Sequence, residues 1–144
     1  MKNITFINNK YVDHKNAKIS VEDRGMLFAD SIYELISVFN KNIIDLEPHL
    51  DRLKSSLKKI KINYKFNKNN FKKIFNKLIK VNKIENGYIY IQITRGVAER
   101  KHEFPNKYTP TTIIFTKHLN INKKVYEKGV KVITIPDLRW LRRD

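Results

Sequence analysis

The segment from residue 87 to residue 105 constrains the fold of this chain more than any other; it reads G-Y-I-Y-I-Q-I-T-R-G-V-A-E-R-K-H-E-F-P. Between residues 88 and 94 every second position is an isoleucine: Ile89, Ile91 and Ile93. This period of two predicts a strand with one face buried in a core. At Arg95 the alternation stops, so we expect a loop that begins there and is closed by Pro105.

The predicted loop carries Arg100 and His102, which are two residues apart. An arginine presents a planar fork that can bind a carboxylate through two parallel hydrogen bonds, and a nearby imidazole can add a third donor. Two such donors next to a rigid strand suggest an anion receptor. The alternative is a solvated basic loop on a basic protein. The residues alone leave both interpretations open.

Length and composition indicate a folded protein of one domain, or of one domain and the start of another. Hydrophobic residues make up 41% of the 144 positions, too many for a disordered chain. The absence of cysteine excludes disulfides and thiolate metal sites, and we predict no metal site. No segment has the apolar run of a signal peptide or of a membrane span, which needs about 20 residues. We therefore expect a soluble, cytoplasmic protein with no membrane partner.

The net charge of +16 would by itself favour a nucleic-acid partner. The lysines, however, are spread along the chain among many asparagines and isoleucines, and most of them fall on predicted helix faces that would be exposed anyway. We therefore expect no nucleic-acid partner. A stand-alone basic nucleic-acid-binding module stays as the alternative from a different functional class.

The remaining hydrophobic pattern predicts an α+β fold, in which two helices pack on an antiparallel sheet. Strands are expected at residues 4–7, 11–12, 17–19, 33–39, 43–46, 88–94 and 108–115, a polar loop at 21–25, and helices from Pro48 to about Ile60 and from Asn69 to Ile84. Residues 1–117 would form this domain and residues 118–129 a linker. A further strand at Val130–Ile135 cannot stand alone in water, so residues 130–144 are interpreted as the start of a truncated second domain.

The first predicted helix carries His49 and Arg52 in its first turns, beside the stripe of leucines that it would bury. The N-terminal end of a helix carries unpaired backbone donors and the positive end of the dipole, which favours an anion there. Alternatively, Arg52 pairs with a local carboxylate, either Asp51 or Glu47. On the residues alone the second interpretation is the simpler one.

Four segments of the chain together resemble the class IV aminotransferases, which are pyridoxal-phosphate enzymes of fold type IV, and most closely their D-amino-acid aminotransferase branch. They read E-D-R-G-M-L-F-A-D-S-I-Y-E at 22–34, H-L-D-R-L at 49–53, G-Y-I-Y-I-Q-I-T-R-G with R-K-H at 87–102, and D-L-R-W-L-R-R-D at 137–144. They occur in the family's order and at its spacing. The Arg-x-His pair is the part that separates this branch from branched-chain aminotransferases and aminodeoxychorismate lyases.

The resemblance implies a role for five residues. Arg52 matches the arginine that binds the phosphate of pyridoxal 5'-phosphate, and His49 matches a histidine that supports the cofactor pocket, although a purely structural role for His49 also stays open. Tyr33, Arg100 and His102 match the residues that bind the α-carboxylate of the substrate. In the family the last two reach across from the partner subunit, which implies a homodimer with shared active sites.

The implied activity is the transfer of an amino group between a D-amino acid, such as D-alanine, and a 2-oxo acid. A branched-chain aminotransferase or an aminodeoxychorismate lyase is the alternative within the family.

Two departures from the family pattern stand out: Ser31 replaces a glycine that is frequent in relatives, and the chain ends at Asp144, just before the family's Schiff-base lysine. We therefore expect residues 130–144 to begin the cofactor-binding domain, and this chain alone to contain no catalytic residue and to be inactive.

Overall fold

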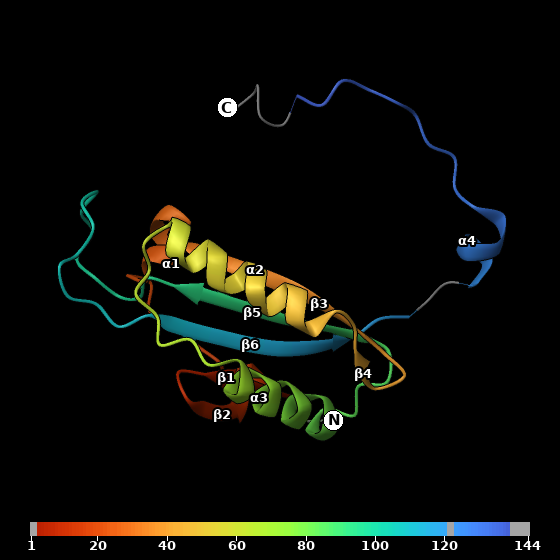
Figure 1. The fold of residues 1–144 in the computed structure, drawn as a ribbon, viewed down its shortest axis with the longest axis horizontal. Helices are drawn as coiled ribbons and strands as arrows, with labels where there is room; N and C mark the ends of the chain where they lie inside the picture. Colours follow the sequence, from red (N-terminus) through yellow and green to blue (C-terminus); the bar gives the residue numbers. More distant parts are fainter. Residues whose placement is uncertain (1–2, 121–122, 139–144) are drawn as a thin grey trace.

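The computed structural model of the chain describes residues 3–120 and 123–138, and its centre is a six-stranded antiparallel sheet with the order β2-β1-β6-β5-β3-β4 (Figure 1). The strands are β1 (Ile4–Ile7), β2 (Lys10–Asp13), β3 (Ser31–Phe39), β4 (Asn42–Ile43), β5 (Gly87–Thr94) and β6 (Thr111–His118). Every neighbouring pair is antiparallel. The predicted α+β fold with an antiparallel sheet is confirmed.

Strand β5 is paired on both sides along its whole length, with β3 on one side and β6 on the other. Its three alternating isoleucines are fully buried, as the period of two predicts. The strand is therefore a rigid base for the loop that follows it, because its backbone hydrogen bonds are satisfied on both edges.

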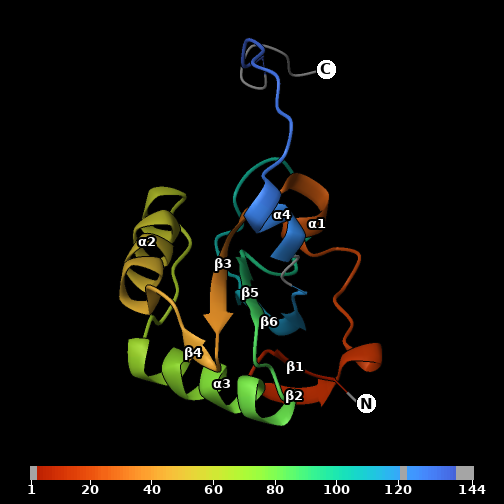
Figure 2. The same ribbon diagram turned by 90° about the vertical axis from the view of Figure 1, so that its right-hand side faces the viewer.

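Two helices, α2 (Leu46–Lys59) and α3 (Lys68–Val81), cover the same face of the sheet (Figure 2). Their buried residues recur at helical spacing: Leu50, Leu53 and Leu57 in α2, and Phe71, Ile74, Phe75, Leu78 and Ile79 in α3. Helix α2 begins at Leu46 rather than at Pro48, because the chain turns at Asp45, whose φ is +48°. Helix α3 ends at Val81 rather than at Ile84, because the backbone reverses at Lys83, where φ is +54°.

The N-terminal segments differ from the prediction in two places. A short helix, α1 (Arg24–Phe28), begins within the polar loop expected at residues 21–25, because the Asp23 carboxylate caps it by accepting a hydrogen bond from the Gly25 amide (2.8 Å). The predicted strand at residues 17–19 is wrong. A 3-10 turn at His14–Asn16 redirects the chain after β2, and Ile19 is left exposed.

The C-terminal part also differs from the expected linker and strand. Strand β6 runs to His118, and a helix, α4 (Lys123–Lys128), lies within the predicted linker. Residues 130–135 belong to none of the six strands, and the side chains of Val132 and Ile133 are 80% and 86% exposed. An isolated strand has no partner for its backbone groups, which accounts for this difference. The domain boundaries stay predictions, and the motif residues 139–144 lie outside the described residues.

Within the residues that the structure describes, none of the helices combines the length and the hydropathy that crossing a lipid bilayer requires.

Candidate functional site

A buried carboxylate, Glu34, joins two of the predicted site residues between β3 and α2. Arg52 donates from Nε to Oε1 (2.7 Å) and from Nη2 to Oε2 (2.5 Å) of Glu34. His49 lies one turn earlier on α2, and its Nδ1 lies 2.8 Å from Oε2 of the same carboxylate. Because an ionised carboxylate only accepts, this nitrogen of His49 carries the hydrogen. Arg52 therefore binds Glu34 through two charge-assisted hydrogen bonds, and His49 adds a third to the same carboxylate.

The sheet explains why Glu34 lies there. Its position on β3 is in phase with the buried Ile36, and it pairs in register with Ile91 of β5, so its side chain points to the helix-covered face. Only 4% of the Glu34 side chain is exposed. A carboxylate buried among apolar side chains needs partners, and α2 supplies them. This alternation was the signal in the sequence that could have identified Glu34, which our sequence analysis missed.

The electrostatics of this group keep Glu34 charged and orient Arg52. Burial raises the pKa of Glu34, but the hydrogen bonds from Arg52 and His49 outweigh it, so the pKa is lowered overall. In return, the hydrogen bond to Glu34 raises the pKa of Arg52. The Arg52 side chain is still 66% exposed. Its guanidinium is therefore held in a fixed plane while part of it stays accessible to an anion.

The expected alternative partners of Arg52 are wrong. Asp51 pairs with Lys68 (2.6 Å), and Glu47 pairs with Lys68 and Lys72. Both carboxylates lie on the exposed side of α2, whereas Arg52 points toward the sheet and meets Glu34.

Tyr33 lies on the opposite face of the sheet from Glu34, because successive side chains of a strand alternate. It is 65% exposed, and its ring stacks on Tyr90 with 5.7 Å between centroids. Tyr90 in turn stacks on Phe115 of β6 at 4.9 Å. This row of rings fixes the plane of Tyr33 and leaves its side chain open to a ligand or to another surface.

Arg100 and His102 lie together in the loop between β5 and β6, and both are exposed. They share one platform, the ring of Phe28 in α1. The Arg100 guanidinium carbon lies 5.5 Å from the centre of this ring, and the His102 ring centre lies 5.5 Å from it. The structure thus brings together His49 with Arg52 and, separately, Arg100 with His102, while Tyr33 lies on the open face.

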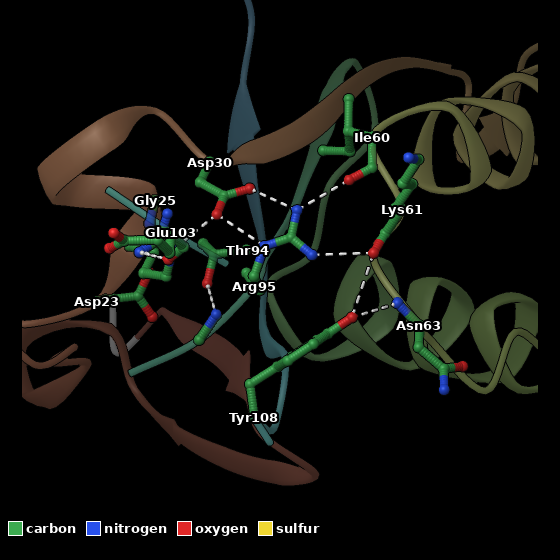
Figure 3. Close-up of polar contacts among 12 residues, drawn as sticks. Asp23, Gly25, Asp30, Ile60, Lys61, Asn63, Thr94, Arg95, Glu103 and Tyr108 are labelled. Carbon is green, nitrogen blue, oxygen red and sulfur yellow. Dashed lines mark hydrogen bonds and ion pairs between the residues drawn. The ribbon is translucent and has the colours of Figure 1, made fainter. Parts of the chain in front are cut away.

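A buried ion cluster lies under the same loop and was also missed from the sequence (Figure 3). Asp30 accepts hydrogen bonds from Nε of Arg24 (2.8 Å) and from Nε and Nη2 of Arg95 (2.7 and 3.0 Å). Arg95 also donates to the carbonyl oxygens of Lys61 (2.9 Å) and Ile60 (2.8 Å) at the end of α2. These three charged side chains, which we call the Arg24–Asp30–Arg95 cluster, are at most 8% exposed.

The cluster extends the buried rows of the sheet. Asp30 is in phase with Ile32 of β3, and Arg95 is in phase with Ile93 of β5, so the ion pair follows directly on the last pair of inward-facing residues. Burial raises the pKa of Asp30, but the hydrogen bonds from Arg95 and Arg24 outweigh it and lower the pKa overall. The alternation of side chains that places Glu34 on the buried face of the sheet therefore also places Asp30 and Arg95 there.

The donors on this chain suit anions rather than metals. Among residues 3–120 and 123–138, no three His, Cys, Asp or Glu side chains converge as a metal site would require. An oriented, partly accessible guanidinium such as that of Arg52 is well suited to a phosphate group.

Ser31, the departure noted in the sequence, is accommodated: it begins β3 without a left-handed backbone, and its hydroxyl accepts a hydrogen bond from Gln92 (2.9 Å).

Comparison with known proteins gives the family. The family model described as Amino-transferase class IV matches residues 31–143. A D-alanine aminotransferase from Staphylococcus aureus (strain MSSA476) is 39% identical over 140 residues, which cover 96% of this chain and 50% of that protein. A D-alanine aminotransferase from Bacillus licheniformis is 34% identical over 137 residues, covering 95% of this chain and 48% of that protein. The chain thus spans about half the length of the curated relatives it matches.

Solved structures agree on the fold. The branched-chain amino acid aminotransferase of Escherichia coli superimposes with a TM-score of 0.77 at 19% identity, covering 83% of this chain and 40% of that one. The 4-amino-4-deoxychorismate lyase of Pseudomonas aeruginosa gives a TM-score of 0.70 at 20% identity, covering 88% and 44%. At such identities the likeness shows the fold alone. Together, the family match over most of the sequence and the shared fold confirm the resemblance: the chain belongs to the class IV aminotransferase family.

Proposed function

We propose that this chain provides the substrate- and phosphate-binding half of a pyridoxal-phosphate-dependent transaminase that moves an amino group between a D-amino acid, such as D-alanine, and a 2-oxo acid. The observation that carries the proposal is the exposed pair Arg100 and His102, both of which lie against the ring of Phe28. The similarity to D-alanine aminotransferases over nearly the whole chain supports this choice of substrate.

Arg52 is the residue that would hold the phosphate of the cofactor. Glu34 fixes two of its three guanidinium nitrogens, and the side chain is still mostly exposed. His49 would support this arrangement by donating to the same carboxylate. When bound, pyridoxal phosphate supplies an electron sink for the bond that breaks at the α-carbon, while the protein orients the substrate.

Arg100, His102 and Tyr33 would bind the carboxylate of the substrate. A carboxylate bound by two or three donors has a fixed orientation, which determines the face on which the α-hydrogen is presented and hence the chirality that is accepted. Tyr33 lies on the open face of the sheet, whereas the other two lie in the loop beside α1. We therefore include a homodimer in the proposal, with each site built from two chains, in the cytoplasm.

The test uses a chimera, because the chain matches only half of each curated relative. Residues 1–144 are fused to the second half of the Staphylococcus aureus enzyme. Formation of the 2-oxo acid product is measured with D-alanine, L-leucine and aminodeoxychorismate, with a different 2-oxo acid present as the amino acceptor. We expect turnover of D-alanine, little of the other two, and none by the 144-residue chain alone. Preferential turnover of L-leucine or of aminodeoxychorismate would overturn the proposed substrate.

A matched pair of variants tests the proposed carboxylate site. In the chimera, Arg100→Gln should raise KM for D-alanine about tenfold or more, because one charge-assisted hydrogen bond contributes roughly 1.5 to 3 kcal/mol. Lys107→Gln removes a positive charge from the same β5–β6 connection and should leave KM unchanged. Equal effects of the two changes would indicate a general effect of charge rather than a specific contact.

A further inference from the structure

The loop that carries Arg100 and His102 has little apolar burial of its own. The residues from Arg100 to Phe104 are all exposed, and Phe104 is 60% exposed. A loop of this kind is expected to be mobile unless specific hydrogen bonds fix its backbone. Specific contacts to the rest of the fold are therefore needed to fix the backbone of this loop.

Arg24 of α1 provides such a contact. Its Nη1 donates to the carbonyl oxygen of Lys101 (2.7 Å) and, at longer range, to that of Glu103 (3.3 Å). These two carbonyl groups lie on either side of His102 in the sequence. The Arg24 side chain is only 3% exposed, so its bonds to the loop form in a largely water-free environment, where hydrogen bonds from a charged group are strong.

Arg24 is itself held rigidly. Its Nε donates to Asp30, which also accepts two hydrogen bonds from Arg95. Arg95 is bonded in turn to carbonyl groups at the end of α2. The loop is therefore connected through one carboxylate and two guanidinium groups to the main helix–sheet core.

Aromatic rings also contact the two arginines of the cluster. The Arg24 guanidinium carbon lies 4.7 Å from the centre of the Phe28 ring, on which Arg100 and His102 also pack. The Arg95 guanidinium carbon lies 4.1 Å from the centre of the ring of Phe104, which follows Glu103 in the loop. Both guanidinium groups thus stack on an aromatic ring while they donate hydrogen bonds.

We propose that Arg24 is a positioning residue for the carboxylate-binding pair: it fixes the backbone around His102 and, with Phe28, holds Arg100 and His102 in one orientation. The role of the pair in binding substrate rests on the proposed function, whereas the ordering of the loop by Arg24 does not. Lysine cannot replace Arg24 in this role, because a single ammonium group cannot bind Asp30 and the loop carbonyls with the same planar geometry.

Limited proteolysis of the 144-residue chain tests the ordering of the loop. Trypsin cleaves after Arg100 and Lys101, so the cleavage rates at these two bonds report directly on the loop. We expect Arg24→Lys to raise them about tenfold relative to cleavage after Lys54 in α2, measured by mass spectrometry under native conditions. Lys41→Gln, which removes an exposed ion pair with Glu85, is the control and should leave the ratio unchanged.

An unchanged ratio in Arg24→Lys, in a protein that is still folded, would overturn the proposal. If Arg24→Lys does not fold, the unaltered chain decides. The residues Arg100, Lys101 and Lys107 are all exposed in the β5–β6 connection, but only the first two adjoin the backbone that Arg24 binds. Slower cleavage after Arg100 and Lys101 than after Lys107 supports the proposal, and equal or faster cleavage overturns it.

Kinetics of the chimera separate positioning from general stability. If Arg24 positions the loop, Arg24→Lys raises KM for D-alanine about tenfold with kcat little changed. A structural role alone lowers the active fraction, which reduces kcat at constant KM, and this result would contradict the proposal. If the chimera has no transaminase activity at all, the proposed function fails, while the proteolysis still tests the role of Arg24.

Discussion

Glu34 shows at the scale of one residue how a charge in the buried row of a strand can serve a binding site. An unpaired carboxylate in that position would cost several kcal/mol, because burial removes its hydration. Arg52 and His49 supply three hydrogen bonds, two of them from a single planar group. The same contacts fix the orientation of Arg52, so stability and the proposed binding of phosphate depend on the same atoms.

Glu34→Gln should therefore destabilise the fold. An amide presents only one acceptor oxygen, and its NH2 group would face the donors of Arg52. We expect the free energy of unfolding to fall by about 2 kcal/mol at pH 7, as measured by urea denaturation. Glu47→Gln, made on an exposed carboxylate that pairs with Lys68 and Lys72, is the matched control and should have no measurable effect. Equal losses in the two variants would contradict this assignment.

Some of these residues could be predicted from the sequence, and others could not. His49 and Arg52 were proposed for the cofactor pocket through the segment H-L-D-R-L, which resembles the family, whereas the residues alone favoured a local ion pair for Arg52. Glu34 and Arg95 were missed because a charged residue in the inward phase of a strand looks like an interruption of the pattern. Its partner comes from a distant segment, which the spacing of residues along the chain does not reveal.

At the scale of elements, the connection from β5 to the loop depends on Gly96. This residue has a φ of +98°, and a Cβ atom there would collide with the carbonyl oxygen of Thr109. Its carbonyl also accepts the amide hydrogen of Arg24 (2.9 Å), so the turn joins the end of β5 to the start of α1. A side chain at this position would disturb both elements.

Gly96→Ala should lower the free energy of unfolding by about 3 kcal/mol, because it combines backbone strain with a backbone clash. Gly129→Ala is the matched control. Gly129 also has a positive φ, +69°, but nothing lies within 4 Å of the Cβ atom that would be added. It should change the stability by no more than about 1 kcal/mol. Urea denaturation of the two variants gives the comparison, and similar losses in both would show that strain alone, without the clash, sets the cost.

The predicted elements were reliable where a long periodic pattern was present, as in α2, α3 and β5. They failed where a few local contacts decide the structure. Helix α1 is only five residues long and depends on the cap at Asp23, and residues 17–19, where a strand was expected, follow the 3-10 turn at His14–Asn16 without regular secondary structure. The strand expected at Val130–Ile135 would need a partner edge, and the alternation of side chains cannot say whether one is there.

At the scale of the whole molecule, the excess of positive charge lies at the surface. The net charge is +16, and most of the lysines of α2 and α3 are exposed, whereas Asp30 and Glu34, whose side chains are at most 8% exposed, are each bonded to arginine. The exposed positive charge repels itself and is only partly screened by salt. The buried ion pairs act in the opposite direction, and their contribution depends on both carboxylates staying ionised.

The fold should therefore be sensitive to acid. Folding lowers the pKa of Asp30 and of Glu34 below the ordinary values of about 3.9 and 4.3, so near pH 4 the unfolded chain binds more protons than the folded one. The free energy of unfolding thus rises with pH across this window. The contribution of the two carboxylates to stability is fully present above about pH 5 and is lost as the pH falls through their lowered pKa values. Protonation of the other carboxylates also increases the net positive charge.

Thermal melting between pH 7 and pH 3 measures this dependence. We expect a nearly constant Tm down to about pH 5 and a steep decrease below pH 4. Glu34→Gln should have a lower Tm at pH 7 and a shallower decrease in acid, because one of the two titrating carboxylates is gone. A decrease in Glu34→Gln that is as steep as in the unaltered chain would show that surface repulsion, rather than loss of the buried pair, sets the acid limit.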